Sequence, residues 1–127
     1  MLDGPRDHQH GMLRRVLHRL AADTGELDAQ ALQQDTAAAG ATPVVACHNR
    51  EVVTVYGVLR TVTLRPRGGA PTLEAQLYDG SGAIELVWLG RRRIAGIEPG
   101  RQLVVRGRLT IEGGQRTVFN PDYELRP

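Results

Sequence analysis

A series of short alternating segments separated by turn residues runs from Val52 to Glu124, and it constrains the fold more than any other feature. Short strands at regular spacing, bounded by glycine, proline and aspartate, are typical of a small antiparallel barrel or sandwich. The pattern predicts a mainly β fold, a five-stranded Greek-key barrel. The turns lie at Asp79-Gly80-Ser81-Gly82, Pro99-Gly100, Gly113-Gly114 and Asn120-Pro121-Asp122-Tyr123-Glu124.

Alternation of apolar and polar residues predicts five strands. They span Val52–Leu64, Thr72–Tyr78, Ala83–Leu89, Gln102–Ile111 and Arg116–Phe119. The fourth strand has the clearest pattern, with apolar residues at every second position facing the core. Gly57, in the middle of the first strand, predicts a bulge or the sharp bend at which a small barrel closes. A bulge would exchange the core-facing and solvent-facing positions of the later residues in that strand.

The residues before this barrel predict one or two N-terminal helices. Apolar residues recur at helical spacing between Met12 and Leu20, opposite a basic face, and Asp28–Ala39 is a second helical segment. Met12 is an alternative start of the chain. We therefore expect a disordered tail over residues 1–11, a helical segment over 12–43 and the barrel domain over 44–127.

Composition narrows the class of protein. The 127 residues suit one domain and contain no apolar run of about 18 residues, the length that crosses a membrane. The first residues lack the basic segment followed by an apolar segment that is typical of a signal peptide, so we expect a cytoplasmic protein. Cys47 is the single cysteine, which excludes an internal disulfide. All 16 basic residues are arginine. From Arg50 to Arg116, 11 arginines and 6 acidic residues give a local net charge of +5. This charge favours a polyanionic partner, with solubility as the alternative explanation.

Several of these segments resemble a known family. Leu77-Tyr78-Asp79-Gly80-Ser81-Gly82, the run Ile84–Trp88, Val105-x-Gly107-Arg108 and the closing Asn120–Glu124 segment together resemble an anticodon-binding-type OB-fold. The barrel is similar to the wedge domain of RecG-type helicases, and the chain is similar to small stand-alone actinobacterial OB-fold nucleic acid binding domain proteins. The resemblance implies nucleic-acid binding by an OB-fold. The sequence lacks a Gly-x-x-x-x-Gly-Lys-Ser/Thr loop and any lysine, so the similarity does not extend to an ATPase motor.

Binding residues follow from how single-strand binders work, with a positive groove for phosphates and aromatic side chains for bases. Tyr56 and Tyr78 face outward and are candidates for base stacking, with cross-strand packing as the alternative. Arginine candidates lie outward on the first and fourth strands and in the two loops that commonly clamp ligands. They are Arg60, Arg65, Arg67, Arg106, Arg108 and Arg116.

Weaker candidates complete this set. Trp88 shares its facing with Ile84 and Leu86, which favours the core or rim of the barrel over a binding role. Arg91, Arg92 and Arg93 form either a phosphate contact or a solvated run. Phe119 and Tyr123 are expected to cap the barrel and its closing turn.

The sequence holds no recognisable catalytic arrangement. Asp79 lies in a turn where its side chain normally bonds backbone amides, and Cys47 in an apolar run suits a small buried residue. We expect no enzyme activity, no cofactor and no metal site. The function expected is a non-catalytic module for single-stranded or branched DNA, or for RNA, with weak sequence specificity. The alternative is a protein-interaction or self-association module, including a homodimer, built on the barrel and the Met12–Leu20 helix.

Overall fold

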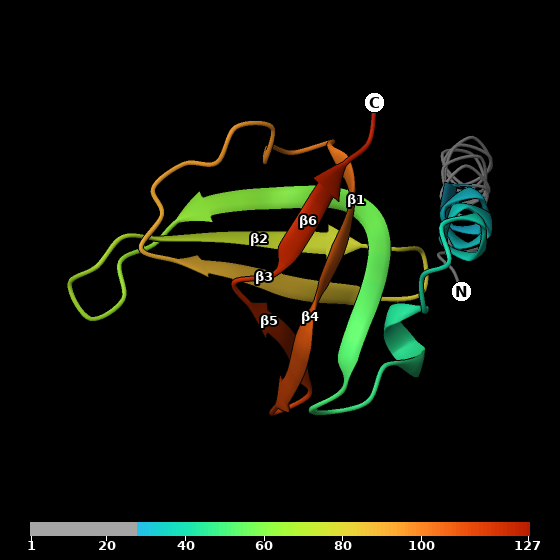
Figure 1. Cartoon of the computed structure of the whole chain (residues 1–127), viewed down its shortest axis with the longest axis horizontal. Coiled ribbons are helices and arrows are strands. Elements are labelled where there is room, and N and C mark those ends of the chain that lie inside the picture. Colours follow the sequence, from blue (N-terminus) through green and yellow to red (C-terminus); the bar gives the residue numbers. More distant parts are fainter. Residues whose placement is uncertain (1–27) are drawn as a thin grey trace, which may run out of the picture.

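The computed structural model describes residues 28–127 (Figure 1). Residues 28–38 are helical, and a short 3-10 helix, η1, spans Val44–Ala46. Six strands follow: β1 (Val52–Leu64), β2 (Thr72–Tyr78), β3 (Ala83–Leu89), β4 (Gln102–Glu112), β5 (Gln115–Phe119) and β6 (Asp122–Leu125). The expected tail over residues 1–11 and the Met12–Leu20 helix lie outside the described residues. The proposed division of the chain into segments stays a prediction.

The strands close into the expected barrel. Their order is β1-β2-β3-β5-β4-β6, and β1 also pairs with β4. Among the strands of residues 28–127, only the β3–β5 pairing is parallel. In Figure 1, β1 curves strongly, so that its two halves belong to different parts of the barrel wall. The prediction of a mainly β, five-stranded OB barrel with an N-terminal helix is confirmed.

The closing segment differs from the expected turn, because it forms β6. β5 pairs with β4 from Leu109 to Glu112, and β6 pairs with the earlier part of β4, from Leu103 to Arg106. Both run antiparallel to β4 along the same edge, so the chain continues in one direction. Asn120, with a positive φ of 51°, and Pro121 interrupt the ladder between them.

β1 changes its pairing partner from β4 to β2 next to Gly57 and carries no bulge at this glycine. The pairing with β4 is regular from Val52 to Val58, and pairing with β2 begins at Val58. A Cβ atom at Gly57 would collide with the backbone carbonyl oxygen of Tyr78. Glycine is therefore required by close approach of two backbones. The register shift lies three residues later, between Leu59 and Thr61, which leaves Arg60 as the extra residue. Of the two alternatives that Gly57 predicted, the bulge is absent, and the change of partner beside this glycine agrees with the other, a bend where the barrel closes.

Substituting Gly57→Ala should destabilise the barrel by about 2 kcal/mol or more, because the new methyl group must push β1 and β2 apart. Urea unfolding followed by circular dichroism measures the change. Thr61→Ala, at an exposed position of the same strand, serves as the control. A change below about 0.5 kcal/mol for Gly57→Ala, within the range of neutral surface substitutions, would contradict the close approach.

The core lies inside the barrel, where the inward residues follow the predicted alternation. On β4, Leu103, Val105 and Leu109 are buried, while the outward arginines of that strand are exposed. Val44 and Cys47 close one part of the core from the N-terminal side. The Cys47 thiol has a raised pKa, chiefly because it is desolvated, as expected for a small buried residue.

Asp79 ties the β2–β3 turn to η1. One carboxyl oxygen accepts hydrogen bonds from the Ser81 hydroxyl at 2.7 Å, the Ser81 amide at 2.9 Å and the Gly82 amide at 3.0 Å. The other accepts the Val44 amide at 2.7 Å. The side chain therefore holds backbone amides, as its turn sequence predicts.

The helix over residues 28–38 covers part of the outer surface of β1. Asp35, Ala38, Tyr56 and Gln102 are among the residues that line a crevice of about 300 Å³ between helix and barrel. In residues 28–127, no helix has the length and apolar character needed to cross a bilayer. The helix therefore shields the outer surface of the barrel around Tyr56 from solvent.

Candidate nucleic-acid interface

Two neighbouring hollows beside β4 and β5 share Thr110 and Glu112, and we call the two hollows together the β4–β5 groove. The larger hollow, of about 500 Å³, is lined by Asn49, Arg50, Arg108, Thr110, Ile111 and Glu112. The smaller, of about 210 Å³, is lined by Arg67, Thr110, Glu112, Gln115, Thr117 and Phe119. Thr110 and Thr117 are cross-strand partners at the middle of the groove. The groove therefore joins residues from β4, β5 and the β1–β2 loop.

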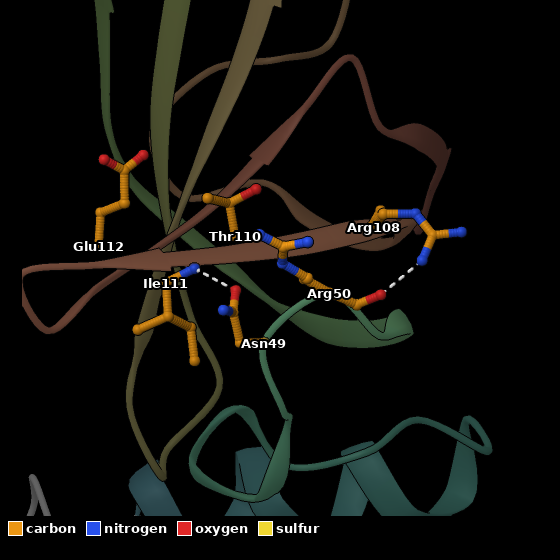
Figure 2. A pocket seen from close by; sticks show the side chains of 6 residues that line it. All are labelled: Asn49, Arg50, Arg108, Thr110, Ile111 and Glu112. Atoms are coloured by element: carbon orange, nitrogen blue, oxygen red, sulfur yellow. Dashed lines mark hydrogen bonds between the residues drawn. The ribbon is translucent and has the colours of Figure 1, made fainter.

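Arg50 and Arg108 form one end of the groove (Figure 2). Arg50 has a positive φ of 70°, an uncommon conformation for a residue with a side chain. Its amide donates to the Leu109 carbonyl at 2.7 Å, and its own carbonyl accepts a hydrogen bond from the Arg108 guanidinium. The adjacent Asn49 side chain accepts the Ile111 amide at 2.9 Å. These bonds to β4 hold the strained residue beside Arg108.

Neither Arg50 nor Arg108 forms an ion pair with a carboxylate of residues 28–127. Figure 2 shows Thr110 and Glu112 on one side of β4, with Ile111 and Asn49 on the other. Guanidinium groups without a carboxylate partner are suited to bidentate phosphate recognition. This end of the groove can therefore hold an anion.

Arg67 and Phe119 form the opposite end. Phe119 is 42 % exposed, and the Arg67 Cζ atom lies 5.9 Å from the centre of its ring. Arg67 Nη2 lies 3.0 Å from a Glu74 carboxylate oxygen, and Arg65 Nε lies 3.6 Å from the other oxygen. Two arginines thus share one carboxylate, which fixes the β1–β2 loop over the sheet and leaves one net positive charge.

Arg60 and Tyr78 lie together elsewhere on the outer surface. The Arg60 Cζ atom is 3.5 Å from the centre of the Tyr78 ring, so the two groups stack directly. Arg60 reaches this position because it is the extra residue of the β1 bulge. The exposed guanidinium therefore covers one face of Tyr78, the ring that the sequence predicts as a stacking platform.

Tyr56 corrects our prediction of an accessible stacking residue. It occupies an outward position of β1, but it is only 6 % exposed. Its hydroxyl donates to Gln102 Oε1 at 3.2 Å, and it shares the crevice beneath the helix with Asp35. Desolvation, followed by the charge of Asp35, raises the pKa of Tyr56. The helix therefore removes this ring from solvent.

Trp88 lies in the core, as its facing predicts. It is 4 % exposed, its indole nitrogen donates to the Pro121 carbonyl at 3.2 Å, and its ring meets Tyr123 edge to face with centres 5.9 Å apart. Tyr123 therefore packs against the aromatic core residue. Phe119, predicted as a second cap, instead lies exposed on the groove.

The remaining candidate arginines lie outside the groove. Arg106 is exposed on β4, where its pairing partners are Thr54 and Asp122. Arg116 lines a separate hollow of about 360 Å³ together with Gln76, Glu85 and Gln115. The exposed residues Arg91, Arg92 and Arg93 follow β3 on its connection to β4. The structure thus brings Arg67 and Arg108 into one groove and separates the other candidates from it.

Arg50 and Phe119 are the arginine and the aromatic residue of the groove that the sequence did not predict as binding residues. The alternation of β5 offers a signal for Phe119, because Val118 faces the core and its neighbours must face outward. For Arg50 the sequence holds no comparable signal, because its position depends on a left-handed backbone conformation before β1.

Glu85 places a carboxyl group on the same outer surface, on β3. Burial, followed by the charge of Glu74, raises its pKa above the ordinary value, and Arg65 partly opposes this. The folded state therefore binds its proton more tightly than the unfolded state. Stability from this group is highest at acidic pH and is lost as the pH rises through the raised pKa.

Replacing Glu85→Gln should consequently raise the melting temperature at pH 7 and have less effect near pH 4, where the wild-type carboxyl is protonated. Thermal unfolding of both proteins across this pH range measures the difference. Glu98→Gln, at an exposed site, is the control. A stabilisation by Glu85→Gln that is equal at both pH values would rule out the desolvated carboxyl as its cause.

Known proteins share this fold. Residues 53–126 match the family model described as OB-fold nucleic acid binding domain, with the family name tRNA_anti-codon. The p204 HINb domain superposes with a TM-score of 0.57 at 16 % identity, covering 72 % of this chain and 49 % of that one. RecG bound to a three-way DNA junction gives 0.50 at 23 % identity, covering 62 % and 11 %.

A replication protein A heterotrimer bound to ssDNA gives a TM-score of 0.44 at 21 % identity, covering 60 % of this chain and 56 % of that one. This chain thus spans less than two thirds of each of these solved chains. A search of curated sequences finds no match. The family model covers more than half of the sequence, from the first core position of β1 to the end of β6. The chain therefore belongs to the family of OB-fold nucleic acid binding domains.

Proposed function

We propose that this protein is a non-catalytic module that binds single-stranded or branched DNA, or RNA, along the β4–β5 groove. The observation that carries the proposal is the groove itself, which joins two guanidinium groups that form no ion pair within residues 28–127 to an exposed aromatic ring. Phosphates would contact Arg50 and Arg108 at one end. A base would contact the Arg67–Phe119 end. Thr110 and Thr117 supply hydroxyl groups between them.

Most of this binding energy would come from the phosphate backbone. Guanidinium contacts to phosphate release counterions and carry no sequence information, so affinity should fall with rising salt and depend weakly on sequence. The excess of arginine between Arg50 and Arg116 would add long-range attraction. Glu112, within the groove, and Glu74 and Glu85, on the same outer surface, limit this attraction to the two arginine-bearing ends.

Fluorescence anisotropy tests the proposal. Labelled single-stranded DNA, duplex DNA and RNA are titrated with the protein at low and at physiological salt. We expect saturable binding to at least one of them, with the logarithm of the affinity falling linearly with the logarithm of salt. Absence of binding to all three at low salt would refute the proposed function.

A further inference from the structure

The Arg67 guanidinium lies farther from the Phe119 ring than the Arg60 guanidinium lies from the Tyr78 ring, the other arginine–aromatic pair of residues 28–127. Arg60 lies 3.5 Å from the Tyr78 ring centre, the distance of direct stacking, whereas Arg67 lies 5.9 Å from the Phe119 ring centre. Successive bases in a strand are about 3.4 Å apart, so a base between two flat groups needs about 6.8 Å. The Arg67–Phe119 gap is about 1 Å short of this value.

A small movement of Arg67 would open the gap fully. Arg67 lies in the β1–β2 loop, directly before Gly68 and Gly69, and both glycines have positive φ angles. Glu74 nevertheless holds the Arg67 guanidinium by one edge, because Nε and Nη2 of Arg67 each lie 3.0 Å from the same Glu74 oxygen. The charged group is therefore held above the ring by an ion pair. Because the Arg67 backbone is bonded to Ala70 in both directions, at 2.8 and 2.9 Å, the adjustment of about 1 Å would fall to the long Arg67 side chain.

The rest of this hollow presents polar groups to whatever enters it. Thr110, Thr117, Gln115 and Glu112 line the same space as the Phe119 ring. A carboxylate accepts hydrogen bonds only, so it pairs with an exocyclic amino group and opposes a carbonyl oxygen. Cytosine, adenine and guanine each carry an exocyclic amino group on the pairing edge, whereas thymine and uracil carry none.

Resting on the function proposed above, we infer that the Arg67–Phe119 gap is a slot for one unpaired base that bears an exocyclic amino group: cytosine, adenine or guanine. The base stacks between the guanidinium and the phenyl ring, and its amino group donates to Glu112. A paired base cannot enter, because its edge is occupied and its faces are covered by neighbouring bases. The slot therefore makes the protein select single strands and disfavour thymine.

Anisotropy with single-stranded oligonucleotides of about 12 nucleotides, within the range that OB folds cover, tests the slot. Oligo-dC, oligo-dA and oligo-dT are compared with a duplex of mixed sequence. We expect dC and dA to bind about tenfold more tightly than dT. Phe119→Leu keeps the apolar volume but removes the ring and should weaken dC binding about tenfold, the effect of losing one stacked base. Phe119→Tyr keeps an aromatic ring and should bind oligo-dC as tightly as the wild-type protein.

Glu112→Gln provides the second variant. The glutamine amide can donate as well as accept, so the ratio of dC affinity to dT affinity should fall towards one. Loss of the negative charge changes the affinity for both oligonucleotides alike and therefore leaves this ratio unaffected. If wild type binds all oligonucleotides equally and Phe119→Leu has no effect, the slot is refuted while the proposed groove stands. If wild type binds no nucleic acid, the proposed function itself fails. Thermal unfolding confirms that each variant is folded.

Discussion

Reversing both charges in Arg50→Glu/Arg108→Glu is expected to weaken binding of single-stranded DNA by at least about tenfold at low salt. Both guanidinium groups lie at one end of the groove without a carboxylate partner among residues 28–127. A hydrogen bond to a charged group contributes about 1.5–3 kcal/mol, and two repulsive charges would replace two such contacts. The slope of log affinity against log salt should also become shallower by about 2.

The matched control is Arg92→Glu/Arg93→Glu, which changes the net charge equally but lies on the exposed β3–β4 connection. It should reduce affinity much less, through long-range attraction only. Equal losses for the two double variants would show that overall charge, and not the groove, determines binding. Arg106→Glu reverses a charge two residues from Arg108 on β4. Because Arg106 does not line the groove, this single variant should lose about half as much binding free energy as the double control variant.

Replacing Asp79→Ala is expected to destabilise the protein by about 3 kcal/mol or more, a large share of the 5–15 kcal/mol typical of a domain. The side chain is 1 % exposed and accepts four hydrogen bonds, one of them from the buried Val44 amide. Its loss leaves buried donors without partners, and each unsatisfied donor costs about 1–3 kcal/mol. Urea unfolding measures the change.

Asp79→Asn is the sharper variant. Asparagine has one acceptor oxygen and one amino group, so it cannot accept from both Val44 and the Ser81–Gly82 turn. It should therefore be destabilised as well, though less than the alanine variant. Asp122→Ala, at an exposed acidic residue, should be nearly neutral. An Asp79→Asn protein as stable as wild type would show that the bond to Val44 contributes nothing.

The sequence predicts the barrel well because alternation reports directly which residues face a core. The inward residues of β4, and the core position of Trp88, follow from this rule. The bulge at Arg60 could not be predicted, because a register shift depends on the partner strand. Nor could the burial of Tyr56, since alternation identifies the outer face of a strand but not the helix that covers it.

The site was harder to predict than the fold for a related reason. Arg67 lies in a loop and Arg108 faces outward, as the sequence predicts, but their position beside one groove depends on the ion pairs that Glu74 forms with the β1–β2 loop. Arg50 reaches the groove through a left-handed backbone conformation that no pattern in its neighbours indicates. Spatial convergence of distant residues is therefore what the structure adds.

The most direct test of the groove is to map the contacted face by nuclear magnetic resonance. Amide chemical shifts of the ¹⁵N-labelled full chain are recorded as single-stranded oligo-dC is added. We predict that the largest changes fall on Thr110, Thr117 and Phe119 and on the β1–β2 loop around Arg67, with small changes at Tyr56 and in residues 28–38. Changes concentrated on Tyr56, Gln102 and the covering helix would contradict this account and place the interface on the helix-covered part of the barrel.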